Sequence, residues 1–160
     1  MALEVLHMDS AFALGAYDRV ILQSWTAKVK KEDVVVGYEH GHKIAQRFAP
    51  EKIAAIAIAD TKSGLPDEET RKLSAEMIQK MKDAHAASAI VLEGSGFWSS
   101  AARAAVTGIH LLARTPFPTK PFATVELASE WVGSYFQWPP DRIAALATAM
   151  HELRAKQKTA

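Results

Sequence analysis

Asp60 and Glu93 are the residues best placed for chemistry, because each directly follows a continuous apolar run. The runs, Ile53 to Ala59 and Ala86 to Leu92, are typical of β-strands that are covered on both faces. Carboxylates at the carboxyl ends of parallel strands meet at the edge where open α/β sheets bind ligands. Asp60 and Glu93 could therefore share an acid–base site, although carboxylates at strand ends also commonly cap helices. The partner would be one of four scattered histidines: His7, His85, His110 or His151.

A glycine-rich turn, Glu93-Gly94-Ser95-Gly96, follows the second apolar run and precedes a helical pattern. Backbone N–H groups in such a turn can hold an anion. However, Ser99 stands where a dinucleotide fingerprint has its third glycine, and no P-loop lysine follows. The glycines also flank Ser95 directly, whereas a nucleophile elbow has them two residues away. The first interpretation of this turn is a strand-to-helix connection in which Ser99 caps the following helix. Alternatively, it is a ligand site made of Glu93, Gly94, Ser95, Gly96, Phe97 and Trp98.

The sequence offers no recognisable metal or cofactor site. His40 and His42 lie two residues apart in a helical segment, so their side chains point about 200° away from each other and cannot share one ion. The chain has no cysteine, which excludes disulfides, thiol catalysis, zinc ribbons and iron–sulfur clusters. We therefore expect no metal, no cofactor and no catalytic residue. A hydrolase or acid–base enzyme using Asp60, Glu93 or Ser95 is the least favoured hypothesis.

Composition indicates one globular domain of ordinary charge. The 160 residues include 19 Lys and Arg against 18 Asp and Glu, a net charge of +1. A near-neutral chain is a poor partner for nucleic acid, whose binding depends on phosphate neutralisation. No apolar stretch reaches the ~18 residues of a membrane span, and the first nine residues do not resemble a signal peptide. We expect a cytoplasmic protein without a membrane span and without nucleic acid as a partner.

Hydrophobic periodicity predicts an α/β fold. Alternation over 3–8, 12–14 and 19–26 predicts an N-terminal β-meander. Strands and helices then alternate, which favours a mostly parallel sheet with flanking helices. The expected helices are 31–48, which Pro50 ends, one following Pro66, 99–114, and 125–136, which Thr124 opens; the expected strands are 53–59, 86–92 and 121–123.

The end of the chain predicts an extra helix. Pro139-Pro140 is the one clear linker, and it separates residues 1–136 from an amphipathic segment at 141–157. Ile143, Leu146, Met150 and Leu153 follow a three-four-three spacing that forms one apolar stripe. Such a stripe is too short for a stable isolated coiled coil. The segment at 137–160 therefore packs either on the domain or on a partner, which leaves a homodimer through 141–157 open.

Two groups of motifs resemble a known family over about residues 1–136. The β-meander, Ile-Ala-Ile-Ala-Asp60 and Pro66-Asp-Glu-Glu-Thr-Arg71 are similar to small bacterial STAS-like domains related to anti-sigma factor antagonists. The stretch from Gly96-Phe97 to Leu111-Leu112, Pro116-Phe117-Pro118 and the segment from Glu126 to Trp131 resemble the SEC14-like branch.

The STAS resemblance implies helices layered on a sheet, no catalysis, and protein contacts through the loop before the second helix. In the antagonists that loop carries a phosphorylated serine, and Lys62 stands at the corresponding place here. Whether Ser63 or Thr61 is phosphorylated stays open. We expect a non-enzymatic regulatory module that binds a protein partner through Asp60, Thr61, Lys62, Ser63, Gly64, Asp67 and Glu68. The SEC14-like kinship implies the alternative, a lipid or other small apolar ligand at the turn of residues 94–98.

Overall fold

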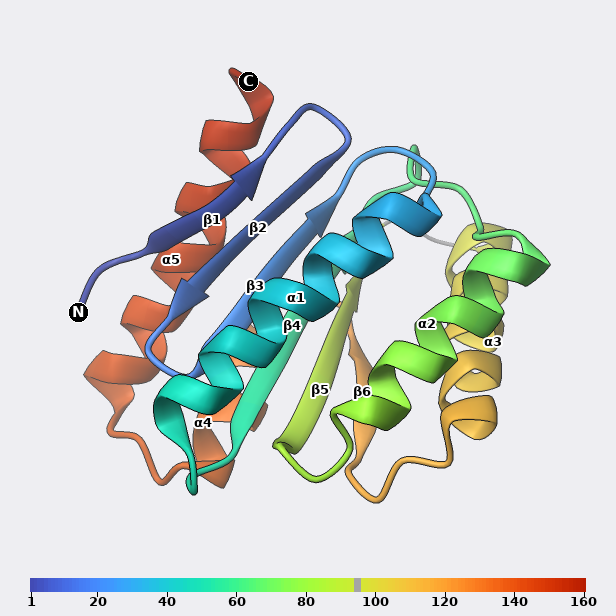
Figure 1. Cartoon of the computed structure of the whole chain (residues 1–160). Coiled ribbons are helices and arrows are strands. Elements are labelled where there is room, and N and C mark those ends of the chain that lie inside the picture. Colours follow the sequence, from blue (N-terminus) through green and yellow to red (C-terminus); the bar gives the residue numbers. More distant parts are fainter. Residues whose placement is uncertain (94–95) are drawn as a thin grey trace.

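A computed structural model describes residues 1–93 and 96–160, without the side chains of residues 97–99. Within these residues the chain forms one six-stranded sheet, and five helices flank it (Figure 1). In chain order the elements are β1 (Glu4–Met8), β2 (Phe12–Tyr17), β3 (Val20–Trp25), α1 (Lys31–Phe48), β4 (Ile53–Ala59), α2 (Glu68–Lys80), β5 (His85–Leu92), α3 (Phe97–Ala113), β6 (Thr119–Phe122), α4 (Val125–Tyr135) and α5 (Pro140–Lys158).

The strands lie in the sheet in their sequence order, from β1 to β6. β1, β2 and β3 are antiparallel neighbours, which confirms the predicted meander. β3, β4, β5 and β6 are parallel, and α1, α2 and α3 form the crossovers between them. The carboxyl ends of β3, β4 and β5 therefore meet at one edge of the sheet, and their amino ends meet at the other.

Helices cover both faces of the sheet (Figure 1). α4 and α5 lie on one face, where they pack against β2 to β6. α1 and α2 lie on the other, and α3 packs mainly against α2. The central strand β4 supplies different side chains to the two layers. Ile56 and Ile58 belong to the core under α4 and α5, whereas Ala55, Ala57 and Ala59 turn to α1, α2 and α3.

The last helix packs on the sheet of its own chain. Leu146, Met150 and Leu153 of the predicted stripe have no exposed surface. A buried hydrogen-bond pair anchors the end of the helix, where the Ser24 hydroxyl donates to Gln157 Oε1 at 2.7 Å and Gln157 Nε2 donates to the Ser24 carbonyl at 3.2 Å. Because the chain itself uses this stripe, a homodimer through 141–157 would need another face of α5.

Several element boundaries differ from those predicted. β2, expected at 12–14, continues to Tyr17. α3 begins at Phe97, with Gly96 as its N-cap, so the expectation of a Ser99 cap is wrong. Gly96 has φ = 65°, a left-handed conformation that glycine adopts readily, and it turns the chain directly into the helix. The strand expected at 121–123 spans Thr119–Phe122 instead, with Pro121 on an edge strand, where its missing N–H is tolerated.

Within the described part of the chain, no helix combines the length and the apolarity that crossing a membrane requires.

Candidate functional site

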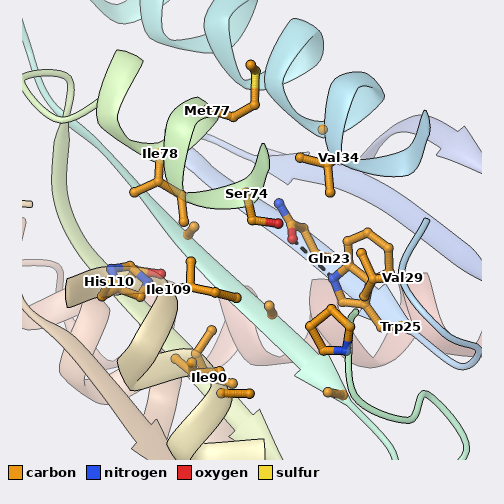
Figure 2. Close-up of a pocket in the computed structure, with 18 of the residues that line it drawn as sticks. Gln23, Trp25, Val29, Val34, Ser74, Met77, Ile78, Ile90, Ile109 and His110 are labelled. Carbon is orange, nitrogen blue, oxygen red and sulfur yellow. Dashed lines mark hydrogen bonds between the residues drawn. The ribbon is translucent and has the colours of Figure 1, made fainter. Parts of the chain in front are cut away.

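A cavity of about 270 Å³ lies between the sheet and the helices α1, α2 and α3 (Figure 2). Its floor consists of the alanines of β4, with Ser88 and Ile90 of β5. Side chains this small fill little of the space beneath the helices. The cavity therefore follows from β4, where Ala55, Ala57 and Ala59 face the cavity while Ile56 and Ile58 point to the other face of the sheet. We call it the α1–α3 cavity.

The helices supply the walls of the α1–α3 cavity. α2 contributes Met77 and Ile78, and α3 contributes Ile109 (Figure 2). α1 contributes two glycines, Gly37 and Gly41. A Cβ atom on Gly41 would lie 3.4 Å from Met81 Cε, and a Cβ atom on Gly37 would have no neighbour closer than 3.9 Å. The surroundings of Gly37 are therefore looser than those of Gly41.

A few polar groups face this mostly apolar space. The Trp25 indole N–H donates to Gln23 Oε1 at 3.2 Å, which fixes the amide of Gln23. Figure 2 shows Gln23 on β3 and Ser74 on α2 directed into the same space. Among the described residues, Gln23 Nε2 and the hydroxyls of Ser74 and Ser88 have no hydrogen-bond partner. These groups are available to a polar atom of a ligand.

Two histidines lie at the end of the cavity near the amino end of β5. The His85 ring stacks on Phe117, with centroids 5.1 Å apart, and the His110 ring meets the same phenyl edge-on. Burial lowers the pKa of His110 to about 4, and the neighbouring His85 adds to this effect. Burial lowers the pKa of His85 as well. Both imidazoles are therefore neutral at neutral pH, and they offer hydrogen bonds rather than charge.

Asp33, in the first turn of α1, lines the opposite end of the cavity. Burial raises the pKa of the Asp33 carboxyl; the backbone N–H of Lys30 opposes this rise and the nearby Asp9 adds to it. His7, Asp9 and Asp33 each place one potential ligand atom within 4.8 Å of the others. This donor set suits a cation, although His7 Nε2 and Asp9 Oδ2 already form an ion pair at 2.9 Å.

The loop predicted to bind a partner lies at the same end of the cavity. Ser63 and Gly64 line the cavity, and Ser63, only 2% exposed, donates its hydroxyl to the Asp60 carbonyl at 2.9 Å. The Asp60 carboxylate accepts the Lys62 N–H at 2.8 Å, whereas the side chains of Thr61 and Lys62 are exposed.

The remaining two residues of the predicted interface belong to α2. Asp67 is the N-cap and accepts the Thr70 N–H at 2.8 Å. Glu68 is exposed in the first turn and forms an i,i+4 ion pair with Lys72. Asp67 thus has a structural role at the start of the helix.

The alternative acid–base site of Asp60, Glu93 and a histidine does not assemble at Asp60. In the described part of the chain, His7 pairs with Asp9, and His151 pairs with Glu126. His85 and His110 lie at the other end of the cavity because they belong to the start of β5 and the end of α3. The alternative of an acid–base pair between Asp60 and one of these histidines therefore finds no support in the described part of the chain.

The Glu93 carboxylate pairs with an arginine side chain from a helix on the opposite face of the sheet. Arg154 of α5 donates both guanidinium nitrogens to its carboxylate, at 2.6 and 2.7 Å. The rest of the predicted ligand turn is described only at Gly96, the N-cap of α3. Gly94 and Ser95 lie outside the described residues, as do the side chains of Phe97 and Trp98.

Comparison with known proteins identifies the fold. No family model and no curated protein matches the sequence. Among solved structures, an uncharacterized protein of the DUF3478 family from Shewanella loihica PV-4, described as having a SpoIIAA-like fold, is similar with a TM-score of 0.51. The alignment covers 82% of this chain and 96% of that chain, at 16% sequence identity. The chain has a SpoIIAA-like fold.

The SpoIIAA-like fold agrees with the STAS-like architecture expected from the sequence, but the cavity within it was not predicted. Its sequence signal is the set of alanines at positions 55, 57 and 59 of β4, together with Gly37 and Gly41 on one side of α1. The β4 run by itself predicts only a strand covered on both faces. Its two faces taken separately show that small side chains follow Ile53 on one of them.

Proposed function

We propose that this chain is a non-enzymatic module that binds one small apolar molecule in the α1–α3 cavity. The observation that carries the proposal is the contrast between the two faces of the sheet. Under α4 and α5, large side chains such as Ile56, Leu146 and Met150 are fully buried in one core cluster. Under α1 to α3, alanines face an open, mostly apolar space.

The size and the lining of the cavity support a ligand rather than a packing defect. Protein interiors are close-packed, with few voids larger than a water molecule. At about 270 Å³, this cavity is just below the range of ~300–1,000 Å³ that is typical of small-molecule sites. Such sites combine an apolar lining with a few polar groups, as Gln23, Ser74 and Ser88 do here. The volume suits a single chain or ring system rather than a two-chain lipid.

Two features favour binding without catalysis. The hydroxyl of Ser63 donates to a backbone carbonyl, so it is not held by a base that could activate it. His85 and His110 are neutral and contact Phe117 at the far end of the cavity.

The cytoplasm, expected from the lack of cysteine, is the setting we propose for this module.

Calorimetric titration with 1-octanol tests the proposal, with two variants of β4 as a matched pair. Ala57→Leu fills the cavity, and we expect it to weaken octanol binding at least about tenfold, since the leucine occupies the ligand's space. Ile56→Val changes the neighbouring side chain, which faces α4 and α5, and should leave the affinity within about twofold. Equal affinities of wild type and Ala57→Leu would contradict binding in this cavity.

A protein partner at the loop of residues 60–64 is a second candidate function. Thr61 and Lys62 are exposed, while the adjacent Ser63 and Gly64 line the cavity, so a bound ligand would alter the backbone beneath an exposed surface. Capture of one defined protein from extracts of the source cells should be lost in the double variant Thr61→Ala/Lys62→Ala. Octanol affinity should be unchanged in that variant. Undiminished capture would exclude this loop as the interface.

A further inference from the structure

The charges that line the α1–α3 cavity point to the kind of ligand it accepts, if the proposed function is correct. Asp33 is the only Asp, Glu, Lys or Arg among the described residues that line the cavity. No lysine or arginine is among the described residues that line the cavity, and residues 94, 95 and 97–99, whose placement or side chains are not described, include neither type. His85 and His110 add no positive charge, because burial keeps both neutral.

Asp33 is placed to meet the end of an elongated ligand. Asp33, Gly37 and Gly41 follow an i, i+4, i+8 spacing on α1, so they lie along one side of the helix, and all three line the cavity. Gly37, whose Cβ position has no neighbour closer than 3.9 Å, adjoins Asp33 along this side. A ligand whose polar end meets Asp33 can therefore extend its apolar body past Gly37, over Ala57 and toward Ile109.

The Asp33 carboxylate has no ion-pair partner in the described part of the chain. Three titratable groups act on the Asp33 carboxyl. His7 belongs to β1, Asp9 follows that strand, and Lys30 precedes α1. Asp9 repels negative charge at this point, and His7 is already paired with Asp9. An unpaired and partly buried charge is unfavourable, and a cation brought by a ligand supplies the missing partner.

The same charges disfavour an anionic ligand. A carboxylate or phosphate would lose its hydration on entering the cavity without gaining a cationic partner, and the Asp33 carboxylate at one end would repel it. We propose that the α1–α3 cavity selects a small apolar molecule that carries a protonated amine, with Asp33 as its counter-ion.

Three eight-carbon probes that differ only in their polar end test this proposal: octylamine, 1-octanol and octanoate. At neutral pH the first is a cation, the second is neutral and the third is an anion, as expected for alkyl amines and carboxylic acids. Calorimetric titrations contain EDTA, which removes metal ions that could occupy the set of His7, Asp9 and Asp33. We expect octylamine to bind about tenfold more tightly than 1-octanol, and octanoate to bind more weakly than both.

Two variants of α1 test whether Asp33 causes the preference for octylamine over 1-octanol. Asp33→Asn removes the charge at nearly constant size and should bring octylamine within about twofold of 1-octanol. Glu32→Gln removes one negative charge from an exposed neighbour that does not line the cavity, and it should keep the preference for octylamine. Circular dichroism melts of both variants check that the fold is retained.

The outcomes separate this inference from the proposed function. If 1-octanol binds but octylamine is not preferred, or if Asp33→Asn keeps the preference, the amine ligand is excluded and the apolar site stands. If none of the three probes binds, the proposed function fails and the inference fails with it.

Discussion

His110 links the stability of the protein to pH. Its Nδ1 lies 2.9 Å from Thr119 Oγ1, and burial lowers its pKa from 6.5 to about 4. Between these two pH values the unfolded chain binds a proton at this residue and the folded chain does not. Protonation therefore favours unfolding, and the stability that the neutral ring contributes is lost as the pH falls from about 6.5 toward 4.

We predict that the free energy of unfolding falls by roughly 2 kcal/mol between pH 7 and pH 5 because of His110 alone. Urea denaturation at the two pH values measures this change. In His110→Gln the decrease should be smaller by about that amount, since glutamine does not titrate. Part of the decrease should remain, because burial lowers the pKa of His85 in the same direction. An identical pH dependence in wild type and variant would contradict the burial of a neutral His110.

Gln157 is the residue that fixes the end of α5, and its role could not be deduced from the sequence. It is 3% exposed, and its amide exchanges hydrogen bonds with Ser24 of β3. Its position near the C-terminus, among charged residues, resembles an ordinary solvent-exposed site. Only the packing of α5 across β2 and β3 brings the two residues together, over a separation of 133 positions.

At the scale of the element, we predict that Gln157→Ala weakens the docking of α5. The substitution leaves the Ser24 hydroxyl without its buried acceptor, and we expect a loss of about 1–3 kcal/mol in the free energy of unfolding. The adjacent Lys156→Ala is the matched control. It removes an exposed i,i+4 ion pair with Glu152 and should cost at most about 0.5 kcal/mol. Similar losses in the two variants, measured by urea denaturation, would contradict the anchoring role.

The strand β4 should respond differently to the same substitution on its two faces. Ala54 is fully buried in the core under α4 and α5, so Ala54→Leu should destabilise the protein by about 1–3 kcal/mol through overpacking. Ala57 faces the cavity, so Ala57→Leu should leave the free energy of unfolding within about 1 kcal/mol of wild type. Thermal and urea denaturation of both variants measure the contrast. A similar loss in both would show that the space beneath the helices is already filled.

Local patterns predicted most elements of this fold. The run from Ile53 to Ala59 has the observed boundaries of β4, because Pro50 and Asp60 enclose an uninterrupted apolar segment. Thr124 was correctly expected to open the helix α4, and its hydroxyl accepts the Leu127 N–H at 3.2 Å. Local signals failed at α3, where the conformation of Gly96 rather than a side-chain cap sets the first residue.

At the scale of the whole molecule, the sheet separates two helical layers that differ in how tightly they pack against it. The layer of α4 and α5 is tightly packed and includes the ion pair between Arg154 and Glu93, which ties α5 to the end of β5. The layer of α1, α2 and α3 surrounds the cavity. Local sequence patterns indicate small side chains on one side of β4, but they cannot predict the volume of the cavity, because it depends on how far three helices stand from the sheet. A change of one layer should therefore leave the other largely intact.

Methyl-selective NMR during titration with 1-octanol tests the central claim most directly, since it locates the ligand residue by residue. We predict that chemical shifts change at Ala57, Ile78 and Ile109, which line the cavity, and stay constant at Ile56 and Leu146, which lie on the other face. Shifts confined to Leu111 and Leu112, which are 73% and 60% exposed, would place the ligand on the outer surface of α3 and contradict the account. So would the absence of any shift.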